Sequence, residues 1–151
     1  MGNLILTSPA FSDGGEIPRE CGYKNGNKRP PLTVSGIPEG TKSLALIMDD
    51  PDAMGAVGKV WVHWVVWNIP PKQDKLGAGI VDGAEGMTDF GEVGYGGPAP
   101  PDKRHTYIFK LYALDTELPK RISNVSTKAD VEKAMKGHII EQTQLTGTYA
   151  P

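Results

Sequence analysis

The sequence of 151 residues lacks the features that mark secreted or membrane proteins. It holds a single cysteine, Cys21, so no disulfide can form within the chain, and this favours a reducing compartment. It has no secretory signal at its start, and no run approaches the ~18 apolar residues of a membrane span. We therefore expect a cytoplasmic protein with no integral membrane association.

Excess positive charge is also missing. The chain has 16 Lys and Arg residues against 18 Asp and Glu residues, which gives a formal net charge of −2 at pH 7. Proteins that bind nucleic acids typically carry a basic surface that attracts the phosphates. We therefore expect no nucleic-acid partner.

The motifs of several enzyme classes are absent as well. The chain contains no G-x-S-x-G nucleophile elbow, no phosphate-binding P-loop, no H-E-x-x-H zinc motif and no paired cysteines. These absences exclude the mechanisms that depend on those local spacings. A functional site would have to be assembled from residues that lie far apart in the sequence.

The chain is rich in turn-forming residues, with 19 glycines and 13 prolines. Short apolar runs between the turns predict buried strands, and one amphipathic segment predicts a helix. We expect one domain over residues 1–151. Strands are expected at 4–6, 32–34, 43–48, 60–69, 105–114 and 144–149, a helix at 127–143, and long irregular loops at 12–31 and 72–92.

The segment 94–109, GYGGPAPPDKRHTYIF, combines three glycines, three prolines and the start of a strand. Glycines let backbone N–H groups approach a ligand closely, and prolines stiffen a loop. Within the strand, His105 and Tyr107 share one face because strand side chains alternate. The pattern fits a surface turn before a strand, and it fits the rim of a pocket equally well.

Two further segments place polar groups beside apolar strands. Asp50 and Asp52 follow the run at 43–48, where a local turn explains them, although Pro51 would also fix the direction of Asp50. His63 lies within the most apolar strand, where a hydrogen-bonded core histidine is more typical than a ligand. Alternation places His63 on one face with Trp61, Val65 and Trp67.

If these strands are neighbours, the two histidines, the aspartates and Tyr107 can converge on one pocket. Two chemistries fit such a pocket. Backbone N–H groups of the glycines, the imidazoles and the tyrosine hydroxyl can donate to a phosphate-like anion, and a nearby carboxylate would keep a histidine protonated. Two histidines and an aspartate can also bind zinc or iron, although no local ligand spacing supports a metal.

Four segments occur in order along nearly the whole chain: DPDA at 50–53, HWVVWNI at 63–69, GGPAPPDKRHTYIF at 96–109 and AMKGHIIEQTQLTGTY at 134–149. They resemble the phosphatidylethanolamine-binding protein family, in particular its prokaryotic Raf-kinase-inhibitor-like branch. The resemblance implies a mostly β fold, a Greek-key β-sandwich with a few short helices, including one near the C-terminus. It also implies a small anion-binding pocket at one end of the sandwich. Carried over by position, the pocket residues are Asp50, Asp52, His63, Gly97, Pro98, His105 and Tyr107.

The chain departs from the family pattern at two positions. Met54 stands where the family motif usually continues with proline, and Thr106 stands where the usual pattern is His-Arg-Tyr. The first change predicts an altered pocket wall. The second removes a guanidinium from the outward face, and we expect the neighbouring Arg104 to replace it in part.

The expected function is a non-enzymatic binding protein that takes a phosphate or a phosphoryl head group, with no cofactor and no resident metal. The resemblance implies inhibition of a partner kinase or serine protease. It also implies a homodimer, because relatives in this branch form dimers. One alternative is a metal-dependent hydrolase that uses His63, His105 and Asp50. The other is a pure interaction module that inhibits a protease through the loops at 12–31 or 72–92.

Overall fold

The computed structural model describes residues 3–72 and 83–151, so residues 73–82 of the expected loop at 72–92 lie outside the described residues. The described part contains two α-helices, α1 (Ala53–Val57) and α2 (Lys128–Met135), and a short 3-10 helix at Arg19–Cys21. Its strands are β1 (Ile5–Thr7), β2 (Gly15–Glu16), β3 (Thr33–Ser35), β4 (Ser43–Asp50), β5 (Trp61–Ile69), β6 (Ala84–Glu85), β7 (His105–Leu114) and β8 (Ile139–Tyr149).

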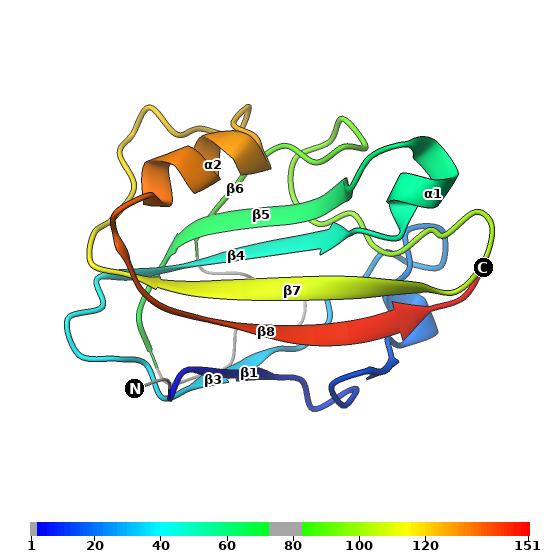
Figure 1. Cartoon of the computed structure of the whole chain (residues 1–151), viewed down its shortest axis with the longest axis horizontal. Coiled ribbons are helices and arrows are strands. Elements are labelled where there is room, and N and C mark those ends of the chain that lie inside the picture. The colour runs from blue at the N-terminus through cyan, green and yellow to red at the C-terminus, as the bar shows by residue number, and fades with distance from the viewer. Residues whose placement is uncertain (1–2, 73–82) are drawn as a thin grey trace.

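The strands form one large sheet and one small sheet (Figure 1). The large sheet has the order β2-β8-β7-β4-β5-β6, and β1 pairs with β3 in the small sheet. Strands β5 and β7 lie on either side of β4, so the chain between them crosses over β4, as a Greek-key order requires. The expected mostly β fold with short helices, one of them near the C-terminus, is confirmed.

Both faces of the large sheet are covered. On one face, a core cluster joins side chains of the small sheet, such as Leu6, to side chains of the large sheet, such as Phe109. On the other face, Val131 and Met135 of α2 pack against Trp67 of β5. This two-sided burial explains why the segments that form β4 and β5 are apolar on both faces. No helix in the described ranges is long and apolar enough to cross a membrane.

The helix predicted at 127–143 is correct at its start and wrong at its end. Thr127 and Asp130 form the expected capping box, in which each side chain accepts from the other residue's backbone N–H. The helix stops at Met135, Gly137 has a φ of +84°, and β8 begins at Ile139. Strand β8 pairs with β7 along its whole length, from Leu114↔Ile139 to His105↔Tyr149. This non-local pairing outweighs the helical spacing of the apolar residues.

Two other segments are more regular than the sequence predicts. The expected irregular loop at 12–31 contains β2, which pairs with β8 in parallel, and the 3-10 helix at Arg19–Cys21. Helix α1 was not predicted, because its five residues are too few to show a helical period. Gly58, with a φ of +79°, ends α1 in the left-handed conformation that glycine adopts without strain.

Helix α2 is tied to the sheet by a buried carboxylate. Asp49 is almost fully buried at the end of β4, on the face that α2 covers. Its Oδ2 accepts a hydrogen bond from Lys128 Nζ of α2 at 2.8 Å and lies 3.3 Å from Lys110 Nζ of β7. Both lysine side chains are less than a third exposed. The carboxylate therefore joins three elements of the fold.

Replacing Asp49 with asparagine is expected to lower the free energy of unfolding by about 1–2 kcal/mol, because two charge-assisted hydrogen bonds become weaker. Urea denaturation at pH 7 measures the change. Adding Lys128→Met to Asp49→Asn should cost less than the sum of the two single substitutions, because they remove the same ion pair. Additive effects would contradict this pairing.

Candidate functional site

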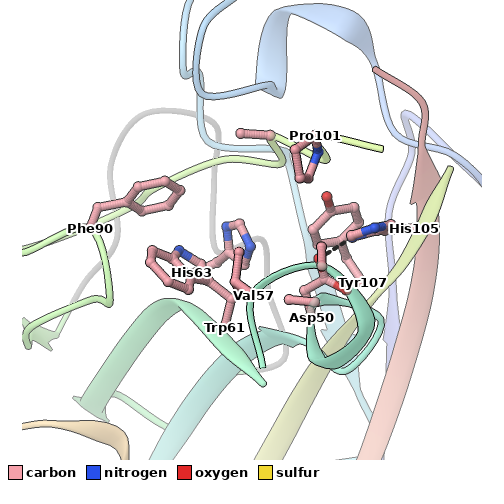
Figure 2. Close-up of a pocket in the computed structure, with 11 residues that line it drawn as sticks. Asp50, Val57, Trp61, His63, Phe90, Pro101, His105 and Tyr107 are labelled. Carbon is pink, nitrogen blue, oxygen red and sulfur yellow. Dashed lines mark hydrogen bonds and ion pairs between the residues drawn. The ribbon is translucent and has the colours of Figure 1, made fainter. Parts of the chain in front are cut away.

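A pocket of about 140 Å³ opens at the end of the large sheet where β4 ends and β5 and β7 begin. Its polar lining comes from Asp50, His63, His105 and Tyr107, all of which are almost fully buried. Its apolar lining consists of Ala53, Ala56, Val57, Trp61, Phe90, Ala99 and Pro101. Figure 2 shows His63 on one side of the pocket and His105 with Tyr107 on the other. The fold thus brings together four of the seven residues that the sequence analysis selected.

His63 reaches the pocket because β5 contains a β-bulge. The register of β5 against β4 shifts by one residue at His63, which leaves this residue without a cross-strand partner. The ring of His63 turns toward Tyr107, with ring centroids 5.1 Å apart. Val65 and Trp67 instead pack in the core under α2. The predicted shared face of His63 with Val65 and Trp67 is therefore wrong, because the bulge breaks the alternation.

His63 is held as a neutral ring. Burial lowers its pKa to about 4, and the nearby carbonyls of Gly96 and Gly97 offset this only in part. Nδ1 of His63 lies 2.7 Å from the carbonyl oxygen of Gly96. A carbonyl can only accept, so Nδ1 carries the proton and Nε2 is an acceptor. In this state Nε2 cannot donate to an anion, contrary to the expectation that both imidazoles supply donors.

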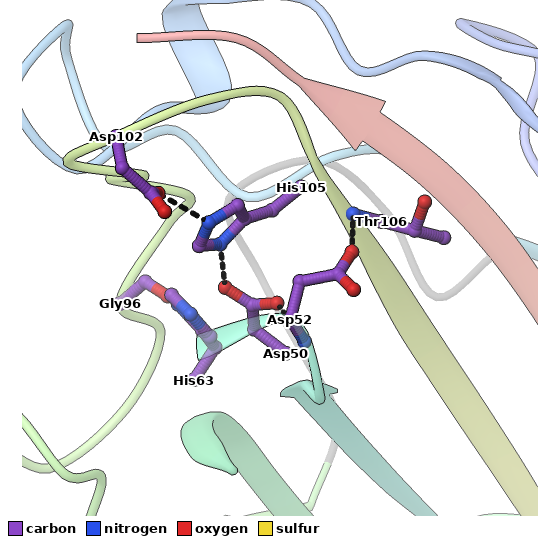
Figure 3. Close-up of polar contacts among 7 residues, drawn as sticks. All are labelled: Asp50, Asp52, His63, Gly96, Asp102, His105 and Thr106. Carbon is purple, nitrogen blue, oxygen red and sulfur yellow. Dashed lines mark hydrogen bonds and ion pairs between the residues drawn. The ribbon is translucent and has the colours of Figure 1, made fainter. Parts of the chain in front are cut away.

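His105 lies between two carboxylates (Figure 3). Its Nδ1 is 2.6 Å from Oδ2 of Asp50, and its Nε2 is 2.7 Å from Oδ1 of Asp102. Burial favours the neutral ring, but the hydrogen bonds to the two carboxylates outweigh it, and the pKa of His105 is raised. The contact with His105 in turn lowers the pKa of Asp102. His105 is therefore held as an imidazolium that donates from both nitrogens.

Asp50 is fixed from two sides. Its Oδ1 accepts a hydrogen bond from the backbone N–H of Asp52 at 2.9 Å, as the turn at Pro51 predicts, and its Oδ2 accepts from His105. Burial raises the pKa of Asp50, and the bonds from His105 and the Asp52 N–H offset this only in part. Asp50 therefore fixes the orientation of the His105 ring through Nδ1 and neutralises part of the charge of His105.

Tyr107 carries a polar group with no hydrogen-bond partner in the described structure. Its hydroxyl is fully buried and lacks a bond of ordinary geometry. Burial and the charge of Asp50 raise the pKa of Tyr107 well above its ordinary value, while the nearby Ala99 N–H lowers it slightly. The hydroxyl therefore stays protonated. Tyr107 thus brings to the pocket wall a buried donor for which the described structure shows no acceptor.

Asp52 is the first selected residue that lies outside the pocket. Its Oδ2 accepts a hydrogen bond from the backbone N–H of Thr106 at 2.8 Å, so it ties the turn after β4 to the start of β7. Arg104 contacts Thr148, the cross-strand partner of Thr106, and lies 3.5 Å from Glu16. The expected partial replacement of a guanidinium by Arg104 stays a prediction.

Gly97 and Pro98 also serve the fold, not the pocket lining. The N–H of Gly97 donates to Oδ1 of Asn27 at 2.7 Å, and the carbonyl of Pro98 accepts from the N–H of Tyr23. The N–H of Gly96 donates to the carbonyl of His63. The prediction that these glycines offer free N–H groups to an anion is therefore wrong. The bonds of Gly97 and Pro98 hold the proline-rich loop against residues 21–27, and the bond of Gly96 ties it to β5.

Two residues of the site were not predicted from the sequence. Asp102 does not line the pocket but contacts His105, and its position three residues before His105 could have pointed to this contact. Phe90 packs edge-on against His63 and Trp61, with ring centroids 5.3 and 5.6 Å away. Nothing in the local sequence marks Phe90, because it comes from a loop. Met54 is exposed on α1 and does not line the pocket, so it does not alter the wall directly.

The described residues contain no group of three or more His, Cys, Asp or Glu side chains arranged to hold a metal ion. Both nitrogens of His105 already face carboxylates, and Nδ1 of His63 faces a carbonyl. The set His63, His105 and Asp50 therefore does not fit a metal centre, and the structure gives the metal-dependent hydrolase no support.

Comparison with known proteins shows strong similarity over nearly the whole chain. The sequence model described as phosphatidylethanolamine-binding protein matches residues 7–150. A UPF0098 protein of Methanothermobacter thermautotrophicus is 43% identical over 97% of this chain and 98% of its own length. A UPF0098 protein of Chlamydia muridarum is 42% identical, with the same coverage. The UPF0098 name assigns no activity.

Two solved structures share the fold. The phosphatidylethanolamine-binding protein homologue CT736 of Chlamydia trachomatis is 40% identical, with a TM-score of 0.90 over 97% of this chain and 96% of that one. E. coli YbcL, described as a member of the mammalian PEBP family, is 33% identical, with a TM-score of 0.87 over 98% of both chains. The arrangement of the two sheets and α2 is therefore common to these prokaryotic proteins.

Proposed function

Because the chain belongs to the phosphatidylethanolamine-binding protein family, we propose that it is a binding protein and not an enzyme. Its ligand carries a phosphoryl group, either as free phosphate or within a lipid head group. The binding site is the pocket that Asp50, His63, His105 and Tyr107 line. Family membership supports the binding role, and the pocket's chemistry supports the phosphoryl group.

The observation that carries this proposal is the buried hydroxyl of Tyr107. A buried donor without an acceptor costs about 1–3 kcal/mol, so a ligand oxygen that reaches this hydroxyl would remove that cost on binding. The hydroxyl needs an acceptor oxygen, and phosphoryl oxygens are strong acceptors. Tyr107 therefore contributes to binding when an acceptor oxygen reaches its hydroxyl.

The charge of the pocket comes from His105. No lysine or arginine lines the pocket among the described residues, so the imidazolium of His105 is its one cation there. The carboxylates of Asp50 and Asp102 favour this charge, and they raise the pKa of His105 despite its burial. Ala53, Val57 and Phe90 form apolar walls, which exclude water and strengthen the interaction between the imidazolium and an anion.

Replacing Tyr107 with phenylalanine is expected to weaken phosphate binding about tenfold, because one hydrogen bond to a charged group is worth about 1.5–3 kcal/mol. The same substitution should leave the free protein as stable as before or more stable, because it removes an unsatisfied hydroxyl. Isothermal calorimetry with inorganic phosphate at pH 5–8 and urea denaturation measure the two effects. His105→Ala should reduce binding further, because it removes the cation.

Three probes separate the sources of the phosphoryl group. Similar affinity for inorganic phosphate and phosphoethanolamine would identify the phosphoryl group as the recognised part. Tighter binding of phosphoethanolamine, and tighter still of water-soluble dihexanoyl phosphatidylethanolamine, would identify a lipid head group. Equal binding by the wild type, Tyr107→Phe and His105→Ala would contradict the pocket assignment.

The other expected properties stay predictions. These are a partner kinase or serine protease, a homodimer and a cytoplasmic location.

The single cysteine, Cys21, is a buried free thiol. Burial raises its pKa to about 11, so the thiol is poorly reactive. A free thiol is consistent with a reducing compartment.

A further inference from the structure

Asp102 occupies the one position from which a ligand could reach the charged edge of His105. Its Oδ1 lies 2.7 Å from Nε2 of His105, whose side chain is fully buried. The other nitrogen, Nδ1, is bonded to Asp50 deep in the fold. A phosphoryl oxygen can therefore accept from His105 only at Nε2. In the described structure the carboxylate of Asp102 accepts this hydrogen bond from Nε2.

The two carboxylates on His105 are held very differently. Asp50 is almost fully buried, and it also accepts from the backbone N–H of Asp52. Asp102 is 43% exposed on the loop that follows Pro101, and its contact with His105 is the one side-chain hydrogen bond that the structure gives it. Asp102 is therefore the less firmly held of the two, because its half-exposed carboxylate can turn into solvent, whereas the buried carboxylate of Asp50 cannot.

Tyr107 provides a second, independent reason to expect an anion at this place. Tyr107 lines the same pocket, its buried hydroxyl has no acceptor in the described structure, and its ring centroid lies 6.3 Å from that of His105. Asp102 satisfies His105 but not Tyr107. A ligand oxyanion that reaches both groups gains a hydrogen bond that the internal carboxylate does not make.

We propose that Asp102 is an internal competitor that occupies the ligand's place on His105 and is displaced when a phosphoryl group binds. The inference rests on the proposed phosphoryl-binding function of the pocket. It makes Asp102 a determinant of specificity. Acetate carries the same carboxylate group as Asp102, so it does not displace Asp102 from His105. A phosphoryl group presents several charged oxygens to His105 and Tyr107, so it does displace Asp102.

Asp102→Ala tests the proposal, with Asp52→Asn as a matched control. Both substitutions remove one negative charge near the pocket, but only the first frees Nε2 of His105. Calorimetry with inorganic phosphate at pH 6.5 should show about tenfold or greater tightening for Asp102→Ala, the size expected when a competing charge-assisted hydrogen bond is removed. Asp52→Asn should tighten binding by only about twofold, because it removes a negative charge that repels the anion only over a longer, screened distance. Asp102→Ala should also bind acetate, which the wild type should not.

The outcomes separate the inference from the function on which it rests. If the wild type and Asp102→Ala bind phosphate equally, or the variant binds more weakly, the competitor role is wrong and the phosphoryl site stands. If neither protein binds phosphate, both the function and the competitor role are wrong. If Asp52→Asn tightens binding as much as Asp102→Ala, charge alone explains the effect and the competitor role is wrong.

NMR titration of Asp102 provides a direct readout of displacement. The hydrogen bond from His105 lowers the pKa of Asp102 in the free protein. Saturating phosphate should raise that pKa toward or above its ordinary value, because the carboxylate loses this bond and gains an anionic neighbour. An unchanged pKa of Asp102 in the phosphate-bound protein would show that Asp102 stays on His105 and would overturn the proposal.

Discussion

Replacing Gly97 with alanine is expected to lower the free energy of unfolding by about 3 kcal/mol or more, or to prevent folding. A Cβ at this position would overlap the carbonyl oxygen of Cys21 and would lie 2.9 Å from the backbone nitrogen of Tyr23. Both atoms are backbone and cannot move aside as a flexible side chain would. The proline-rich loop would have to move away from residues 21–27, which would break the bonds of Gly97 to Asn27 and of Pro98 to Tyr23.

Gly55→Ala is the matched control for Gly97→Ala. Gly55 lies in α1, and a Cβ there would meet no atom within 4 Å. Alanine in a helix is favoured over glycine by about 0.5–1 kcal/mol, so this variant should be as stable as the wild type or slightly more stable. Urea denaturation of the three proteins measures the difference. If Gly97→Ala were as stable as Gly55→Ala, the close packing of the loop would be wrong.

Acidification from pH 6.5 to pH 4 is expected to cost the protein about 3 kcal/mol of stability through His63 alone. The pKa of His63 is about 4 in the folded protein, against an ordinary value of 6.5. Between these values the unfolded chain binds a proton that the folded protein does not. Falling pH therefore favours unfolding, and the full stability is present above pH 6.5.

The variant His63→Asn isolates this contribution, because an asparagine amide can still donate to the carbonyl of Gly96 but does not titrate. Other groups, including Asp50 and His105, titrate in both proteins, so their contributions largely cancel in the difference. Urea denaturation at pH 4, 5, 6 and 7 should show that the stability of the wild type relative to His63→Asn falls as the pH falls. A difference that stayed constant with pH would show that His63 is not buried as a neutral ring.

The sequence predicts most strands correctly because their signals are local. Alternation placed His105 and Tyr107 on one face of β7, and both are buried on that face. Asp50 follows an apolar run and was expected at the end of a buried strand, as observed. The antiparallel pairing of β4 with β7 then brings Asp50 and His105 within hydrogen-bond distance. The sequence allowed this convergence but did not establish it, because it depends on the register.

The features that were missed depend on contacts between distant segments. The β-bulge that turns His63 toward Tyr107 appears only when β5 is paired with β4. The pairing of β8 with β7 turns residues 139–143 into strand although their apolar spacing also fits a helix. Hydrogen bonds from Gly96 and Gly97 to His63 and Asn27 use the N–H groups that the sequence suggested were free.

The central claim is that a phosphoryl group binds Tyr107 and His105 in place of Asp102. A crystal structure of the protein soaked in phosphate, at a concentration that saturates the calorimetric signal, tests it most directly. We expect phosphate oxygens about 2.5–3.0 Å from the hydroxyl of Tyr107 and from Nε2 of His105, with Asp102 turned away from the ring. Phosphate bound elsewhere, for example in the surface hollow beside Arg19 and Lys24, with Asp102 still on His105, would contradict the account.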